Sequence, residues 1–135
     1  MTIVGFSFTK MHAEKKDGTK GKINISNNVS IKDVKEAETA FSSETQKGVK
    51  FFFQFTSKYE PEVGEISLEG NVLYMGKKDE VKKILSTWKK DKKIDSDIMK
   101  DILNTILTKC NIEALILSRE ISLPPPIPLP KVEQK

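Results

Sequence analysis

Apolar and polar residues alternate through most of the first half of the chain, which is the period-two pattern of a strand that buries one face. Residues 49–61 show it most clearly, because phenylalanines follow Val49 at every second position. The same alternation predicts three more strands, so we expect a four-stranded sheet. The three further stretches are residues 3–13, 22–38 and 63–76.

The second of these stretches changes its pattern part of the way along. Val29 and Ile31 share one parity, and Val34 breaks it. A bulge or bend around Asp33 would restore the apolar face of a strand that continues. A helix over residues 32–41 is the alternative, because that segment has a helical composition.

The connections between the predicted strands are short. Asp17-Gly18 is a hairpin signal after the first strand, and Pro61 marks the end of the third strand or an edge position. Four strands that follow one another with short connections predict an antiparallel meander.

The second half of the chain changes to the spacing of amphipathic helices. In residues 77–93, apolar side chains recur at i, i+3, i+4 and i+7, lysines cover the other side, and Asp79 is the predicted N-cap. The apolar positions of this helix are Val81, Ile84, Leu85 and Trp88.

A longer helix is predicted over residues 95–120, with Asp95 and Ser96 as candidate caps. Its two neighbouring apolar stripes exceed what one sheet face would cover, so we expect a second packing partner such as another subunit. One stripe holds Ile98, Ile102 and Ile106, and the next holds Met99, Leu103, Leu107, Cys110, Ala114 and Leu117.

Five prolines fall within residues 124–130, interleaved with Ile127 and Leu129. A linker should lead to a further domain. A ligand for proline-reading domains should be polar or charged around its prolines, whereas Ile127 and Leu129 are apolar. Proline reduces the conformational entropy that an extended segment loses when it is ordered. Its missing N–H suits a sheet edge where no backbone hydrogen bonds to a further strand are formed. We therefore expect residues 120–132 to form a fixed arm that walls a groove, and residues 133–135 to be a disordered tail.

The elements together predict one α+β domain over residues 1–132. Its four-stranded antiparallel sheet carries helices on one face and an extended proline-rich C-terminal arm. No apolar run approaches the ~20 residues of a membrane span. The N-terminal segment lacks a basic region before a long apolar core, so we expect no secretory signal and a cytoplasmic location.

The net charge of +4 is built from lysine, because Arg119 is the single arginine among 23 basic residues. Arginine reads phosphates and base edges with a planar fork, whereas lysine is a hydrated point charge. The charge therefore favours a solvated surface over sequence-specific recognition. The candidates for a salt-sensitive contact with RNA or a ribosome are Lys82, Lys83, Lys89 and Lys90.

The chain contains no phosphate-binding loop, dinucleotide fingerprint, nucleophile elbow or zinc-protease motif. The single histidine, His12, lacks a second histidine or a cysteine cluster, which predicts a surface or turn residue. Cys110 lies on the apolar side of the long helix, which predicts a buried core residue, although a pair with His12 stays geometrically open. We expect no enzyme, no metal site and no cofactor.

Two stretches resemble the SecB-like family of export chaperones. "SREISLPPPIPLPKV", Ser118–Val132, is similar to a shortened form of the proline-containing loop after a SecB helix. "YEPEVGEISLEGNV", Tyr59–Val72, is similar to the turn and fourth strand of that fold. The chain also resembles a small archaeal family of unassigned function that ends in the same arm.

The SecB resemblance implies binding of unfolded clients along hydrophobic grooves, as dimers or dimers of dimers. It implies neither SecB's metal-binding tail nor handover to a SecA motor, because Cys and His are absent after Cys110. The leading hypothesis is a non-catalytic, chaperone-like protein, and an RNA- or ribosome-associated protein is the alternative. The groove candidates are Phe52, Tyr59, Ile66, Pro126, Ile127 and Leu129.

Overall fold

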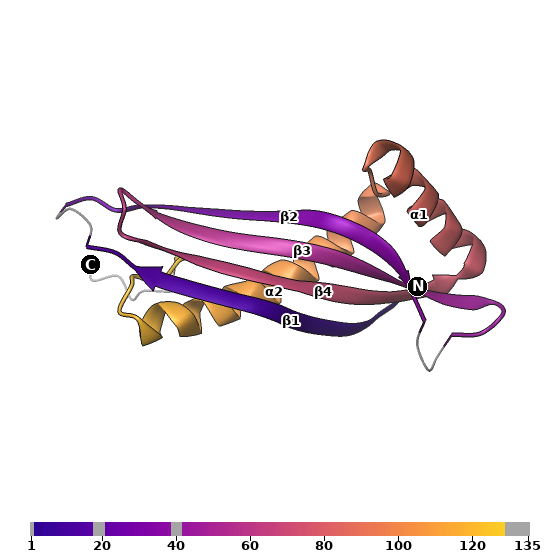
Figure 1. Cartoon of the computed structure of the whole chain (residues 1–135), viewed down its shortest axis with the longest axis horizontal. Helices are drawn as coiled ribbons and strands as arrows, with labels where there is room; N and C mark the ends of the chain where they lie inside the picture. Colours follow the sequence, from indigo (N-terminus) through magenta and orange to yellow (C-terminus); the bar gives the residue numbers. More distant parts are fainter. Residues whose placement is uncertain (1, 18–20, 39–41, 129–135) are drawn as a thin grey trace, which may run out of the picture.

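A computed structural model describes residues 2–17, 21–38 and 42–128, which form four long strands followed by two helices (Figure 1). The strands make one antiparallel sheet, and the helices pack on one face of it, so the predicted α+β class is confirmed. The elements are β1 (Thr2–Lys15), β2 (Asn24–Ala37), β3 (Gln46–Glu60), β4 (Gly64–Lys77), α1 (Lys78–Asp91) and α2 (Ser96–Glu120).

The strand order is β1-β4-β3-β2, so the predicted meander is wrong at its first strand. β1 pairs with β4 at one edge, and the connection after Lys15 carries the chain across the width of the sheet to β2 at the other edge. Asp17 therefore does not open a two-residue hairpin, and Gly18 lies outside the described residues. The remaining strands follow one another as predicted, with Pro61 directly after β3.

Aromatic packing accounts for the position of β1. Phe6 stacks on Phe53 of β3 with ring centroids 5.3 Å apart, and Phe8 meets the same ring edge-on at 6.3 Å. Gly70 of β4 lies opposite Phe8, where the absence of a side chain lets the strands approach. Turn chemistry near Asp17 cannot reveal this arrangement, because the contacts join strands that are far apart in the sequence.

The predicted bulge in β2 is confirmed, and the helical alternative for residues 32–41 is wrong as far as Ala37. The register against β3 shifts between Ile31 and Asp33. The Asp33 carboxylate accepts a hydrogen bond from the Val34 N–H at 2.8 Å, and Val34 is buried. The bulge thus returns an apolar side chain to the core. Residues 39–41 lie outside the described part of the chain.

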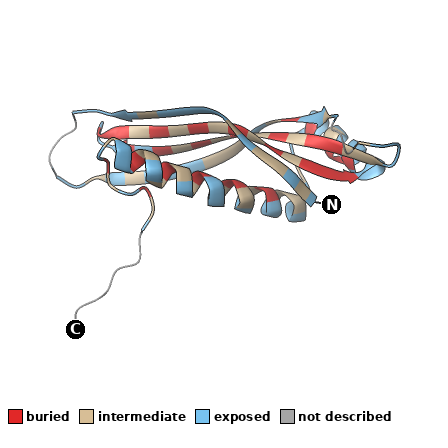
Figure 2. Cartoon of the chain, turned by 90° about the horizontal axis from the view of Figure 1, so that it is seen from below, coloured by how far each residue is buried: buried red, intermediate tan, exposed pale blue. Residues whose placement is uncertain are grey.

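α2 runs along the sheet (Figure 1), and its buried residues form one stripe along the helix (Figure 2). The buried stripe combines members of both predicted stripes, so their division was wrong. The buried residues are spaced four apart, and four residues of an α-helix cover about 40° more than one full turn. The buried stripe therefore winds slowly around the helix, which lets it follow the twist of the sheet. The buried residues are Ile102, Ile106, Cys110, Ala114 and Ser118.

α1 covers one end of the same core through Val81, Ile84 and Trp88. The helix begins at Lys78 with Lys77 as its N-cap, so Asp79 lies in the first turn and is not the cap. In α2 the prediction was right, because the Asp95 side chain accepts a hydrogen bond from the Asp97 N–H at 3.3 Å. No described helix is long and apolar enough to cross a membrane.

Candidate functional site

The proline-rich arm turns back from the end of α2 onto the sheet. The Leu123 N–H donates to the Ser118 carbonyl at 2.8 Å, and Ser122 takes a φ of 56°. Leu123 is buried, and its side chain packs against Gly64 at the start of β4. The arm is therefore anchored to the core at the point where it leaves the helix.

Two side chains of the sheet bind the backbone of the arm. The Tyr59 hydroxyl of β3 donates to the Pro124 carbonyl at 2.6 Å. The Asn27 side-chain N–H of β2 donates to the Pro126 carbonyl at 2.8 Å. Ser57 of β3 in turn donates to the Asn27 side-chain oxygen at 2.5 Å, which orients the amide. Over residues 121–128, the arm therefore lies on its own domain, in contact with β2 and β3.

Burial widens the pH range over which the Tyr59 phenol can donate a hydrogen bond. The residue is 1% exposed, and desolvation raises the pKa of its hydroxyl to about 12. A tyrosine hydroxyl is protonated at neutral pH in any case, and the raised pKa extends the donation to Pro124 into alkaline solution. The contact is a hydrogen bond between two neutral groups, the Tyr59 hydroxyl and the Pro124 carbonyl. The neighbouring prolines have no N–H that could donate to this carbonyl in its place.

Asn27 and Ser57 were not among the predicted site residues, although the pattern contains the signal. Both occupy positions of the alternating pattern that hold apolar or aromatic residues elsewhere in their strands. Asn27 lies between Ile25 and Val29, and Ser57 lies between Phe55 and Tyr59. Buried Ser57 needs a hydrogen-bond partner and finds it in the side-chain oxygen of Asn27, which is itself exposed and donates to the arm. Breaks in the alternation thus mark the place where the arm is bound.

A hollow lies on each side of the arm. One opens between the arm and the last turns of α2, and the other opens between the arm and the start of edge strand β2. The surface of the first hollow is mainly apolar, whereas polar and apolar atoms contribute equally to the surface of the second, although most of its lining residues are apolar. The first is lined by Leu115, Ile116, Ser118, Arg119, Leu123 and Pro125. The second is lined by Ile23, Ile25, Asn27, Pro125, Pro126, Ile127 and Pro128.

The structure separates the six predicted groove residues. Tyr59, Pro126 and Ile127 lie together at the arm, whereas Ile66 is fully buried in the core. Phe52 is half-buried on the opposite face of the sheet, where the Lys35 ammonium lies 5.6 Å from its ring centroid. Leu129 lies outside the described residues. The arm and the Phe52 ring therefore cannot line one groove.

The four lysine candidates lie on one side of α1. Lys82 and Lys83 recur about two turns later as Lys89 and Lys90, and all four side chains are exposed. Among the described residues, none of the four forms an ion pair. Lys83 also borders a hollow between α1 and α2, which is lined by Glu80, Lys83, Ile84, Thr87, Ile94, Asp95 and Ile98.

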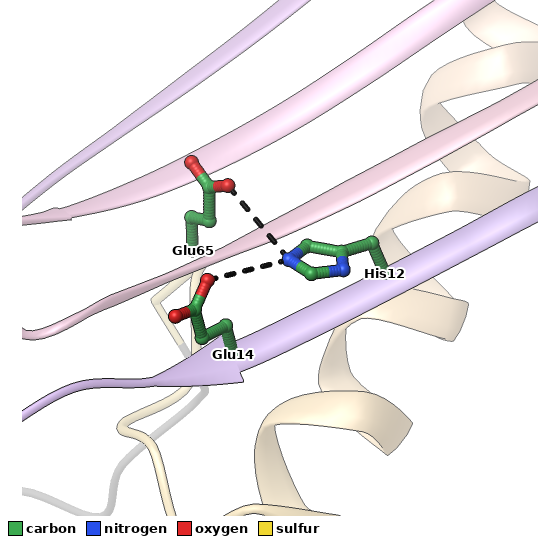
Figure 3. A group of neighbouring side chains, drawn as sticks. All are labelled: His12, Glu14 and Glu65. Carbon is green, nitrogen blue, oxygen red and sulfur yellow. Dashed lines mark ion pairs between the residues drawn. The ribbon is translucent and has the colours of Figure 1, made fainter.

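Cys110 and His12 do not form a catalytic pair. Cys110 is fully buried in α2 against the sheet, and this burial raises the pKa of its thiol to about 12. The neutral thiol is a poor nucleophile at pH 7. His12 is exposed and lies within β1, with the sheet between its ring and α2 (Figure 3).

Comparison with known proteins supports the fold. No protein-family model matches the chain, and no curated protein matches it. The structure is similar to that of the Mycobacterium tuberculosis Rv1957 SecB-like chaperone, solved in complex with a ChAD peptide from the Rv1956 HigA1 antitoxin. The TM-score is 0.56 at 12% sequence identity, and the match covers 99% of this chain and 91% of the other. The chain therefore has the SecB-like fold that the resemblance predicted.

Proposed function

We propose that this chain is a non-catalytic, chaperone-like protein that binds extended or unfolded polypeptide in the apolar hollows beside its arm. The observation that carries the proposal is the anchored arm. Tyr59 and Asn27 hold its backbone, and apolar side chains line the space on each of its sides. Apolar burial is non-directional, so such a surface suits clients of varied sequence.

The edge position of β2 supports an extended client. Ile23 and Ile25, which line one hollow, lie at the start of this strand, and β2 pairs with β3 on one side only. An extended peptide can add to such an edge through its backbone while its side chains enter the apolar hollow. The arm does not close the edge with a ladder, because prolines carry no N–H to donate.

The likeness to a SecB-like chaperone solved with a bound peptide supports polypeptide as the class of partner. We further propose a homodimer in the cytoplasm. α2 leaves Ile112 54% exposed outside the two hollows, which is apolar surface that a second copy could cover.

A binding assay with a reduced, fluorescently labelled unfolded polypeptide tests this function. Ile116→Asn and Ile127→Asn each place a polar amide in one of the two hollows. Each should weaken binding by roughly tenfold, since a tenfold change corresponds to about 1.4 kcal/mol, below the value of a fully buried isoleucine. The intact chain should also suppress aggregation of the client at stoichiometric dose, with little dependence on salt.

Val4→Asn is the matched control, because Val4 is 46% exposed on β1 and lines neither hollow. This variant should bind the client as the original chain does. Absence of aggregation suppression at stoichiometric dose, or equal weakening in all three variants, would contradict the proposed site.

RNA binding through α1 is the second candidate, favoured by four exposed lysines on one side of the helix without an ion pair among the described residues. RNA binding by this face should weaken steeply as salt rises, because counterions are released from the phosphates. Replacing Lys82, Lys83, Lys89 and Lys90 with glutamine should flatten that dependence. An unchanged salt slope in the quadruple variant rejects the lysine face.

A further inference from the structure

A histidine and two glutamates converge on the face of the sheet that the helices leave open (Figure 3). His12 and Glu14 lie two residues apart on β1, so their side chains point to the same face. Glu65 of β4 lies directly opposite Glu14 in the strand pairing. The His12 Nε2 atom is 3.5 Å from the Glu14 Oε2 atom and 3.9 Å from the Glu65 Oε1 atom.

The pairing of the two carboxylates favours a cation between them. Like charges directly opposite each other on neighbouring strands destabilise a sheet. Lys58 of β3 lies opposite Glu65 on its other side, yet no described lysine forms an ion pair with Glu14 or Glu65. The imidazole of His12 is the only described group that forms an ion pair with both carboxylates.

The spacing of the three donors suits a metal ion. Ligands about 2.0–2.1 Å from a tetrahedral zinc ion lie roughly 3.3 Å from one another. All three donor atoms lie within 4.8 Å of each other, and the side chains are about half exposed or slightly less, so small rotamer changes can bring them to that spacing. The backbones that carry them belong to two paired strands and are held by the ladder.

The donor types select the class of ion. An imidazole nitrogen with carboxylate oxygens suits zinc, nickel, cobalt or copper(II), whereas calcium and magnesium prefer all-oxygen sets. We propose that His12, Glu14 and Glu65 form a surface site for a divalent transition-metal ion of the zinc class, with water in the remaining coordination positions. The site lies on the opposite face from the arm, so it is independent of polypeptide binding there.

Titration of the tag-free full chain with Zn2+ tests the site. His12 is the only histidine in the sequence, so the ring signals of a single residue report on the site by NMR. Cys110, the only cysteine, is fully buried and does not compete. We expect one equivalent of Zn2+ to bind by calorimetry and to shift the His12 ring signals, whereas Ca2+ leaves them unchanged.

His12→Gln and Glu65→Gln should each weaken Zn2+ binding by at least about tenfold, the smallest loss typical of removing even an outer partner of a metal ligand. Glu69→Gln is the matched control on the same face of β4, where Glu69 lies opposite Lys10, and it should bind Zn2+ as before. Circular dichroism checks that each exposed substitution leaves the fold intact.

Three results would overturn the proposal. The first is no saturable Zn2+ binding by the intact chain. The second is unchanged affinity in His12→Gln. The third is an equal loss of affinity in Glu69→Gln, which would show adsorption by the acidic surface in general.

Discussion

Single polar residues on a buried face determine where the arm lies. Asn27, Ser57 and Tyr59 point into the core face of the sheet, where their neighbours in each strand are apolar. Ser57 and Tyr59 are buried and would cost free energy there without a partner. Tyr59 donates to the Pro124 carbonyl, and Ser57 donates to the side-chain oxygen of Asn27, whose amide donates to the Pro126 carbonyl. At the scale of the residue, the two hydrogen bonds that hold the arm join distant parts of the sequence. The partners Tyr59 and Pro124 are 65 positions apart, and Asn27 and Pro126 are 99 positions apart.

Tyr59→Phe should detach part of the arm without disturbing the ring packing. The substitution removes the hydrogen bond to the Pro124 carbonyl, so we expect the free energy of unfolding to fall by about 0.5–1.5 kcal/mol. Urea unfolding measures this change, and limited proteolysis should cleave the arm faster. Tyr74→Phe is the control, because no hydrogen bond joins its hydroxyl to another described residue; a similar loss in both variants would argue against the arm contact.

At the scale of the element, each strand and helix was recognisable from its own spacing, whereas its partner was not. The alternation of phenylalanines predicted β3, and the change of parity predicted the bulge in β2. The pairing of β1 with β4 depends on Phe6, Phe8 and Gly70, which meet only when the chain is folded. In α2 the buried stripe also followed the path of the helix across the sheet rather than either predicted stripe.

Gly70→Ala should weaken the β1–β4 pair. A Cβ at this position would collide with the Ser7 carbonyl oxygen, and it would lie 2.9 Å from Cζ of Phe53. The Ser7 backbone cannot move away without breaking hydrogen bonds between β1 and β4. We therefore expect the free energy of unfolding to fall by about 1–3 kcal/mol or more. Thermal unfolding should show a drop of several degrees in Tm.

Gly5→Ala is the matched control for this pair of strands. Its Cβ would meet Leu73 Cβ at 3.4 Å, an ordinary contact, and the added methyl group reduces the freedom of the unfolded chain. We expect its Tm to stay unchanged or to rise slightly. A Gly70→Ala variant as stable as Gly5→Ala would mean that the two strands are less tightly joined than the structure shows.

At the scale of the whole molecule, one core joins the sheet, both helices and the start of the arm. Residues from β2, β3, β4, α1, α2 and Leu123 of the arm belong to a single buried cluster. Groups that titrate inside this core therefore affect the stability of the entire fold. Two of them, Tyr59 and Cys110, belong to different elements and prefer their neutral forms when folded.

Alkaline pH should destabilise the fold through these two groups. Burial raises the pKa of Cys110 from 9.0 to about 12 and the pKa of Tyr59 from 10.0 to about 12. The native state then holds protons that the unfolded state has released, so stability is complete below pH 9 and falls between pH 9 and 12. Urea unfolding at a series of pH values measures the decline.

Cys110→Ala separates the two contributions. In this variant the part of the decline due to the thiol disappears, and the remaining loss should begin near pH 10, where the unfolded tyrosine starts to ionise. If the variant and the original chain declined in parallel from pH 9, Cys110 would not be the buried neutral thiol that the structure shows.

The sequence by itself determined the element types, the α+β class and the bulge near Asp33, because period and parity are local properties of the chain. Only the tertiary structure decided the edge that β1 takes, the stripe of α2 that is buried and the separation of Phe52 from Tyr59. It also brought His12 and Glu14 beside Glu65. These features depend on contacts between distant segments, and the free energy of such contacts is settled by packing in three dimensions rather than by any local pattern.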